Sequence, residues 1–306
     1  MNAKRSAWKP KLLLGADHPE NFPVASVLLP AEVRQKVLTI YQLARFADDL
    51  ADEGPWPVGQ RLACLGELAD MLAGAATGPW LIRSGLEQEA ERCITQWKAQ
   101  SLDRERGINQ EMLLMLSAFA WDTRGFWPQT AEQFDRYCRG SAASVGRMIL
   151  ALFRVGDPNS LEASDAICTA LQRINMLQDC AGDASRGRIY IPASDLKAMG
   201  YDARQWFEYC AMGSLPNRLR DWIRAEAIAQ SEQLRIHQHL HQKLPWRMSL
   251  ELRAIIAGAA AIARALYESP DPVQRRPQMR SALRGAGVLR LLRDWLFGLH
   301  ARAQAP

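Results

Sequence analysis

The amino-acid sequence predicts an all-α protein, and three observations support that prediction. Apolar residues recur at three- and four-residue spacing in one segment after another. No segment shows sustained alternation of apolar and polar residues bounded by turns, which is the pattern of strands. No internal repeat and no linker rich in Pro, Gly or Ser divides the 306 residues. We therefore expect one all-α domain over residues 1–306.

The first predicted helix covers Ala31–Asp52, since it follows Pro30 and the pair Gly54-Pro55 ends it. The other predicted helices share apolar residues at helical spacing, and they run over about 57–73, 85–100, 109–120, 130–153, 160–181, 215–244, 249–267 and 287–299. The last of them is amphipathic and belongs to a basic C-terminal tail at 272–306. It either packs on the core or docks on a membrane.

Composition narrows the class of protein. With 48% hydrophobic and 23% charged residues, the chain is predicted to fold rather than stay disordered. The net charge of +5 is concentrated late in the chain, where seven arginines and one acid follow Val273. Because no nucleic-acid-binding module occurs, we expect no nucleic-acid partner and favour an anionic substrate or membrane surface.

Cysteine usage and hydropathy indicate the compartment. The six cysteines are scattered without C-x-x-C or metal-finger spacing, so we interpret them as reduced thiols of a cytoplasmic protein. The apolar stretch Leu12–Leu14 is too short for a signal peptide, and Ala254–Ala263 is about half the length of a bilayer span. The sequence therefore predicts a soluble or membrane-peripheral protein.

A polar stripe runs along one face of the first predicted helix. Tyr41, Arg45, Asp48 and Asp52 follow one another at intervals of four, three and four residues, and apolar residues fill the positions between them. Residues three or four apart share a helix face. Since like charges at this spacing repel, the pair of carboxylates requires an explanation. One such pair is equally typical of a solvated helix face.

A second predicted helix repeats the pattern. Gln172, Asn175, Asp179 and Asp183 follow at intervals of three, four and four, again between apolar residues. Mg²⁺ prefers hard oxygen ligands, commonly a carboxylate or two with substrate phosphates and water. Two such stripes facing across a cavity would hold the metals of a diphosphate, and this second pair makes the solvated-face interpretation much weaker.

Three arginines flank the stripes. Arg45 shares the first stripe, whereas Arg186 and Arg188 follow the second. A guanidinium group suits phosphate oxygens, although neutralisation of neighbouring aspartates explains the same residues, above all Arg186.

Two other motifs receive a simpler interpretation. His237, His239 and His241 alternate, so only the outer two share a helix face, and we expect a solvated helix end rather than a metal site. The small residues of Gly140–Ala143 lack the Gly-Lys-Ser/Thr of a nucleotide loop. We interpret them as allowing a substrate chain to pass close to the backbone. No dinucleotide fingerprint follows a strand, so no nicotinamide cofactor is expected.

At this point the residues resemble the squalene/phytoene synthase family, whose members process isoprenoid diphosphates on an all-α isoprenoid synthase fold around a central cavity. The resemblance covers most of the chain. Within the family, the sequence is most similar to the hydroxysqualene synthase branch of bacterial hopanoid biosynthesis. It rests on the segments His18–Pro30, Asp48–Glu53, Tyr137–Arg147 and Asn175–Pro192, of which Asn21-Phe22-Pro23-Val24-Ala25-Ser26 is the most discriminating.

The resemblance implies roles for the residues that match the family's motifs. Mg²⁺ would bind at Asp48, Asp52, Asn175, Asp179 and Asp183, whose aspartates, with Tyr137, are the expected catalytic residues. The expected substrate-binding residues are His18, Phe22, Tyr41, Arg45, Val145, Gly146, Gln172, Arg186, Arg188 and Tyr190. The chain departs from the family's pattern at Trp127-Pro128, Ser144, Ser185 and Leu266, none of which touches the metal stripe.

The function implied is the Mg²⁺-dependent conversion of presqualene diphosphate and water to hydroxysqualene and pyrophosphate. One alternative is another head-to-head prenyl synthase, which would form squalene, presqualene diphosphate or phytoene. Another is a catalytically silent relative that acts as an assembly factor. Other enzymes of the squalene pathway are conceivable partners.

Overall fold

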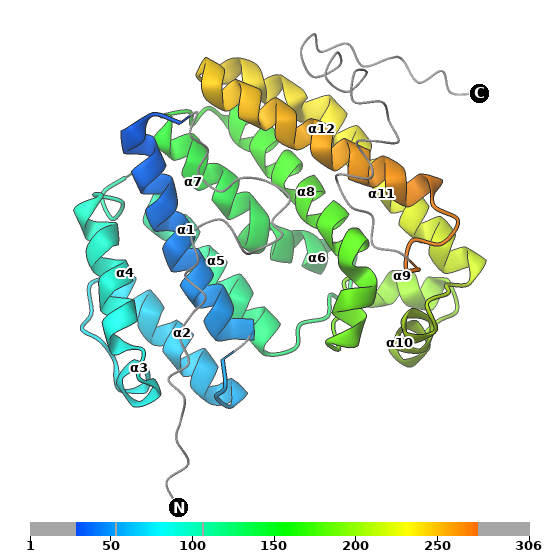
Figure 1. Ribbon diagram of the computed structural model, residues 1–306, viewed down its shortest axis with the longest axis horizontal. Coiled ribbons are helices and arrows are strands. Elements are labelled where there is room, and N and C mark those ends of the chain that lie inside the picture. The colour runs from blue at the N-terminus through cyan, green and yellow to red at the C-terminus, as the bar shows by residue number, and fades with distance from the viewer. Residues whose placement is uncertain (1–28, 53, 106, 275–306) are drawn as a thin grey trace, which may run out of the picture. The chain divides into compact units, whose positions relative to one another are not determined.

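The computed structural model describes residues 29–52, 54–105 and 107–274, and these are helical without a strand (Figure 1). The elements, in chain order, are α1 (Ala31–Asp52), α2 (Val58–Leu72), α3 (Pro79–Ser84), α4 (Glu87–Ala99), α5 (Ile108–Thr123), α6 (Ala131–Cys138), the π-helix η1 (Arg139–Ala143), α7 (Ser144–Leu152), α8 (Pro158–Ser185), α9 (Ala193–Ala198), α10 (Ala203–Met212), α11 (Asn217–His237), the 3₁₀-helix η2 (Gln238–Lys243) and α12 (Trp246–Glu268). The prediction of an all-α protein is confirmed.

Contacts group the chain into two compact units, which are described separately. The described residues of unit 1 come from 29–126 and 136–161, and those of unit 2 from 127–135 and 162–274. One domain over 1–306 stays a prediction. None of the described helices is both long and apolar enough to cross a membrane. The predicted helix at 287–299 and the basic tail lie outside the described residues.

Helix α1 is central to the core of unit 1, where it packs against α2, α4, α5 and α7. Its apolar face presents Leu43, Phe46 and Leu50, all completely buried. Trp97 of α4 is buried as well, and its indole N–H donates to Asn109 Oδ1 at 3.1 Å. Because each of these side chains removes a large apolar area from water, this face stabilises α1 strongly.

The C-terminal end of α1, which carries the carboxylates, is fixed by hydrogen bonds. The carbonyl oxygen of Ala51 accepts from Arg61 Nη1 and, at 3.5 Å, from Thr123 Oγ1. The last carbonyls of a helix have no partner within the helix, so these donors satisfy one of them. Gly54 then lies so close to Leu50 O that an added Cβ would be 2.8 Å away, which explains the need for glycine there.

A π-helix interrupts the helix that the sequence predicts over about 130–153. Gly140 of η1 lies against α5: a Cβ on it would be 3.0 Å from Ala118 Cβ and 3.1 Å from Leu114 O. Ser144 Oγ donates to Gly140 O at 2.6 Å. The uninterrupted helix is therefore wrong. The small residue at 140 serves the approach of α5, and single π-helical turns are frequent at functional sites.

In unit 2, α11 and α12 lie side by side (Figure 1), and most of α8 and all of α10 belong to the same unit. Ile174 on α8, Ile223 on α11 and Ile262 on α12 are fully buried. The prediction of one helix over about 215–244 is also corrected, because the α-helix ends at His237 and continues as the 3₁₀-helix η2. Tighter 3₁₀ turns are frequent at helix C-termini.

None of the six cysteines, all of which lie in the described residues, forms a disulfide bond, and burial controls the chemistry of most of them. Burial raises the pKa of Cys93 to about 12, with a smaller contribution from Glu89, and it raises the pKa of Cys210 to about 12 as well. At pH 8 a thiol with such a pKa is thiolate in only about one molecule in 10⁴.

We therefore expect Cys93 and Cys210 to react with iodoacetamide at least ~100-fold more slowly in the native protein than in the denatured chain at pH 8. Native rates should increase as the pH is raised toward 10, because the thiolate fraction increases. Site-resolved mass spectrometry measures both rates. Native rates within about threefold of the denatured rates would contradict the burial of these thiols.

Candidate active site

The side chains of the polar stripe on α1 differ in their exposure to solvent. The Asp48 side chain is 38% exposed and Asp52 is exposed, whereas Asp49 beside them is only 1% exposed. Tyr41 is half-buried. Asp48 and Asp52 therefore present carboxylates at the surface of unit 1, where a metal ion and phosphate oxygens can reach them.

Arg45 contacts two neighbouring carboxylates at once. Its Nη2 lies 2.7 Å from Asp49 Oδ1, and its Nη1 lies 3.4 Å from Asp48 Oδ2. Burial alone would lower the pKa of Arg45, but the charges of Asp49 and Asp48 outweigh it and raise the pKa above its ordinary value. The guanidinium is thus a permanent cation at the predicted diphosphate position.

Tyr137 lies in an aromatic cluster of unit 1. It is 3% exposed, and its hydroxyl donates to Asp122 Oδ2 at 2.7 Å. Its ring stacks on Phe126 at a centroid distance of 5.1 Å, and Phe126 in turn contacts Trp121 at 5.2 Å. The aromatic faces of such a cluster attract positive charge. Of the other predicted lining residues on α7, Val145 is 39% exposed and Gly146 is half-buried.

The second stripe occupies the C-terminal half of α8 in unit 2. Gln172, Asn175 and Asp179 are half-buried and Asp183 is buried. The helix ends just beyond them, where the backbone N–H of Arg188 donates to Asp183 O at 2.9 Å and Gly187 adopts a φ of +77°. A positive φ favours glycine, so the residue type at 187 sets the turn that brings Arg186 and Arg188 back toward Asp183.

Asp183 is bound to an arginine of the same turn. Its Oδ1 accepts from Arg186 Nη2 at 2.7 Å, and the Arg186 side chain is 61% exposed. Burial raises the pKa of Asp183, and the positive charge of Arg186 only partly offsets that effect. The alternative explanation of Arg186 is that it neutralises a neighbouring aspartate. Its contact with Asp183 agrees with that explanation.

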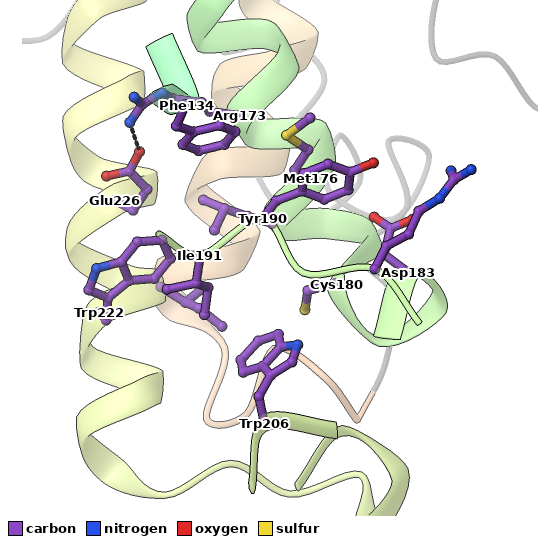
Figure 2. Close-up of a pocket in the computed structure, with 13 residues that line it drawn as sticks. Phe134, Arg173, Met176, Cys180, Asp183, Tyr190, Ile191, Trp206, Trp222 and Glu226 are labelled. Atoms are coloured by element: carbon purple, nitrogen blue, oxygen red, sulfur yellow. Dashed lines mark hydrogen bonds and ion pairs between the residues drawn. The ribbon is translucent and has the colours of Figure 1, made fainter. Parts of the chain in front are cut away.

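Unit 2 also contains a pocket beside the stripe, with about 400 Å³ of empty space including its open mouth (Figure 2). Its walls are mostly apolar and aromatic, with charged groups at the edges: Phe134, Arg173, Met176, Leu177, Cys180, Asp183, Arg188, Tyr190, Ile191, Trp206, Trp222, Ile223 and Glu226. Three of the predicted site residues, Asp183, Arg188 and Tyr190, are therefore brought together at one cavity.

Among the residues of the second stripe, Asp183 lines the pocket, whereas Gln172, Asn175 and Asp179 do not. Arg173, Met176 and Cys180 line the pocket, and each directly follows a stripe residue, so they are rotated from it by roughly 100°. Arg173 is held by Glu226 and Asp135, both at 2.6 Å, as Figure 2 shows for Glu226. The charge of Arg173 is therefore already compensated, and the pocket shares Asp183 and Arg188 with the residues predicted to bind metal or diphosphate.

The four departures from the family's pattern are accommodated locally. Trp127 Nε1 donates to Ile191 O at 2.8 Å, and Pro128 O accepts from the Ala193 N–H at 2.9 Å. Ser185 Oγ donates to Gly182 O at 2.7 Å, whereas Ser144 closes the π-helix as described above. Leu266 is completely buried in unit 2. Trp127-Pro128 thus anchors the segment that follows Tyr190.

The donor set fits Mg²⁺. Asp48, Asp52, Asn175 and Asp179 all offer hard oxygen atoms from exposed or half-buried positions. Within neither unit do the described residues gather three His, Cys, Asp or Glu side chains that would hold a metal alone. Each stripe therefore offers part of a ligand set, which substrate oxygens and water would complete. His18 and Phe22, predicted to bind substrate, lie outside the described residues.

The all-α fold and the paired carboxylates define a protein of the isoprenoid synthase class. The chain belongs to the squalene/phytoene synthase family, whose model matches residues 16–282. It is 33% identical over 273 residues to a hydroxysqualene synthase of Zymomonas mobilis, a match that covers 87% of this chain and 84% of that protein. It is 31% identical over 199 residues to a presqualene diphosphate synthase of Rhodopseudomonas palustris, covering 64% of this chain and 67% of that one.

A solved structure agrees with these relatives. The crystal structure of squalene synthase HpnC from Alicyclobacillus acidocaldarius matches with a TM-score of 0.65 and 29% identity, covering 80% of this chain and 87% of that chain. The family resemblance that the sequence indicates is thereby confirmed, and so is the isoprenoid synthase fold.

Proposed function

We propose that this chain converts presqualene diphosphate and water to hydroxysqualene and pyrophosphate with the help of Mg²⁺. The observation that carries the proposal is the pair of carboxylate stripes with adjacent arginines, in a chain 33% identical to a hydroxysqualene synthase. Bound Mg²⁺ would neutralise the charge of the departing diphosphate. Asp48, Asp52, Asn175 and Asp179 would hold it, and Asp183 would contribute through its contact with Arg186.

The chain's own residues would perform three tasks. Arg45, Arg186 and Arg188 would bind diphosphate oxygens and orient the scissile C–O bond. That bond breaks with its electron pair on the diphosphate, which leaves a cyclopropylcarbinyl cation. Aromatic rings such as that of Tyr137 would stabilise the cation and exclude water until it has rearranged. A water oxygen then bonds to the rearranged cation and loses a proton, so no reductant is consumed.

The relatives also motivate the alternative of another head-to-head prenyl synthase, since one of them is a presqualene diphosphate synthase. The purified chain should be incubated with Mg²⁺ and either farnesyl diphosphate alone or presqualene diphosphate, and the products identified by mass. We expect hydroxysqualene from presqualene diphosphate and no product from farnesyl diphosphate alone. Squalene, phytoene or presqualene diphosphate as the product would assign the alternative function. An inert protein would favour the assembly-factor interpretation.

The two stripes are further predicted to act on one diphosphate. In a crystal structure with Mg²⁺ and pyrophosphate, the side chains of Asp48, Asp52, Asn175 and Asp179 should converge on a space roughly 6–12 Å across, the width of a diphosphate with its metals. Carboxylates directed to opposite surfaces in that crystal would refute the shared site.

We also propose a cytoplasmic, membrane-peripheral location, because free cysteines suit a reducing compartment and a substrate of about thirty carbons partitions into lipid. The arginines of the C-terminal tail should each contribute about 1 kcal/mol near an anionic surface. Co-sedimentation should therefore be stronger with vesicles containing phosphatidylglycerol than with phosphatidylcholine vesicles, and it should weaken on truncation after residue 274. Equal, negligible binding to both would leave the tail only a packing role.

A further inference from the structure

We propose that Asp49 is a positioning residue that fixes the Arg45 guanidinium and thereby keeps Asp48 available to a metal ion. This inference rests on the proposed function and deepens it, because it concerns how the diphosphate site on α1 is organised. Asp49 belongs to neither predicted stripe, and the structure places it inside the protein rather than at the surface.

Burial of Asp49 gives the first argument. Its side chain is 1% exposed, while that of Asp48 next to it is 38% exposed. An ionised carboxylate removed from water is costly unless a charged partner compensates it. Arg45, four residues earlier and therefore on the same face of the helix, is such a partner at 2.7 Å.

The two contacts of Arg45 give the second argument. The distance from its guanidinium to Asp49 is 2.7 Å, whereas that to Asp48 is 3.4 Å. Coulomb attraction increases as the distance between opposite charges falls, so Asp49 is the stronger ion-pair partner of Arg45. Arg45 is 17% exposed and has five N–H donors in a rigid fork, so donors beyond those two contacts remain for substrate oxygens.

These contacts imply that Arg45 and a metal ion compete for the Asp48 carboxylate, and that Asp49 weakens the hold of Arg45 on it. A metal ion at Asp48 needs that carboxylate's lone pairs, and a guanidinium pulled fully onto Asp48 would occupy them. With Asp49 neutralised, Arg45 has Asp48 as its nearest charged neighbour and should move toward it. The metal would then bind more weakly, and the diphosphate would lose a cation held in its place.

The test is an Asp49→Asn variant, which keeps the shape of the side chain and removes its charge. We expect the Mg²⁺ concentration for half-maximal turnover of presqualene diphosphate, and KM for that substrate, to increase by roughly 5- to 50-fold, with a smaller fall in kcat. In an Arg45→Gln background the same substitution should change both constants by less than about twofold, because Asp49 acts through Arg45.

Controls separate this role from general destabilisation. Glu105→Gln neutralises another carboxylate that binds a basic side chain of α1, Lys36 at 2.9 Å, and it should leave both constants unchanged. Thermal melts accompany each variant. If Asp49→Asn fails to fold, Asp49→Glu replaces it, since it keeps the charge and moves the carboxylate by one methylene. We then expect both constants to increase, but by less than the roughly 5- to 50-fold predicted for Asp49→Asn. Constants equal to those of the wild type would overturn the proposal.

Calorimetric titration with Mg²⁺ and inorganic pyrophosphate distinguishes failure of this inference from failure of the proposed function. Pyrophosphate binding by the wild-type chain that is weakened in Asp49→Asn supports the positioning role without requiring turnover. Unaltered pyrophosphate binding and unaltered constants in Asp49→Asn, with an active wild-type enzyme, overturn the positioning role alone. An equally large increase of both constants when Asp49→Asn is made in the Arg45→Gln background also overturns the positioning role. A wild-type chain that neither binds pyrophosphate nor turns over substrate overturns the proposed function.

Discussion

Replacing Asp48 or Asp179 with alanine is expected to lower turnover by at least about 1000-fold without unfolding the protein. Both carboxylates are half-buried, and the contact of Asp48 with Arg45 is long, at 3.4 Å. A carboxylate that binds metal adds little to the stability of the metal-free protein, because neighbouring negative charges repel each other. Loss of the carboxylate instead lowers turnover, because less metal is held where negative charge accumulates on the leaving diphosphate.

The matched control for this experiment is Glu32→Ala, which removes an acidic side chain of the same helix that is 83% exposed. Turnover of this variant should equal that of the wild type. Paired activity assays and thermal melts compare the three variants. Substantial activity after either aspartate substitution would refute the metal role, and a collapsed melting transition would assign the residue to the fold instead.

The second large effect is expected on stability, from Gly140→Val. A Cβ at this position would lie 3.0 Å from Ala118 Cβ and 3.1 Å from Leu114 O, closer than atoms of well-packed proteins normally approach. Overpacking of this kind costs about 1–3 kcal/mol of unfolding free energy. Valine adds two further methyl groups, so α5 and η1 would have to separate.

Gly66→Val is the control, because a Cβ on Gly66, also within a helix, would meet no atom within 4 Å. Valine and glycine differ little in helix propensity, so its unfolding free energy should change by less than about 0.5 kcal/mol. Urea denaturation of both variants measures the difference. Equal midpoints for the two variants would show that the approach of α5 to Gly140 does not constrain the fold.

The sequence predicted the helices that are long and strongly periodic, and the reason is visible at α1. Its predicted bounds agree with the structure because Pro30 precedes it and Gly54, which must avoid Leu50 O, follows it. The short helices α3, α9 and α10 escaped prediction, since six to ten residues carry too few turns for a periodic signal. The π-helix escaped as well, because its cause is a tertiary contact with α5.

The candidate site shows the same division between local pattern and tertiary contact. Spacing along a helix identifies which residues share a face, so the stripes of Asp48 and Asp179 could be predicted. Asp49 was missed although it lies four residues after Arg45, because Asp48 is nearly as well spaced and only burial distinguishes the two. The apolar pocket beside α8 draws Trp206 and Trp222 from helices distant in sequence, and no local pattern links them.

Turnover in ¹⁸O-labelled water tests the central claim most directly. If the chain ionises presqualene diphosphate at its C–O bond and water captures the rearranged cation, hydroxysqualene acquires one ¹⁸O atom and pyrophosphate acquires none. Mass spectrometry of the two products from one reaction decides the matter. An unlabelled alcohol with ¹⁸O in pyrophosphate would mean attack of water on phosphorus, and it would contradict the carbocation account.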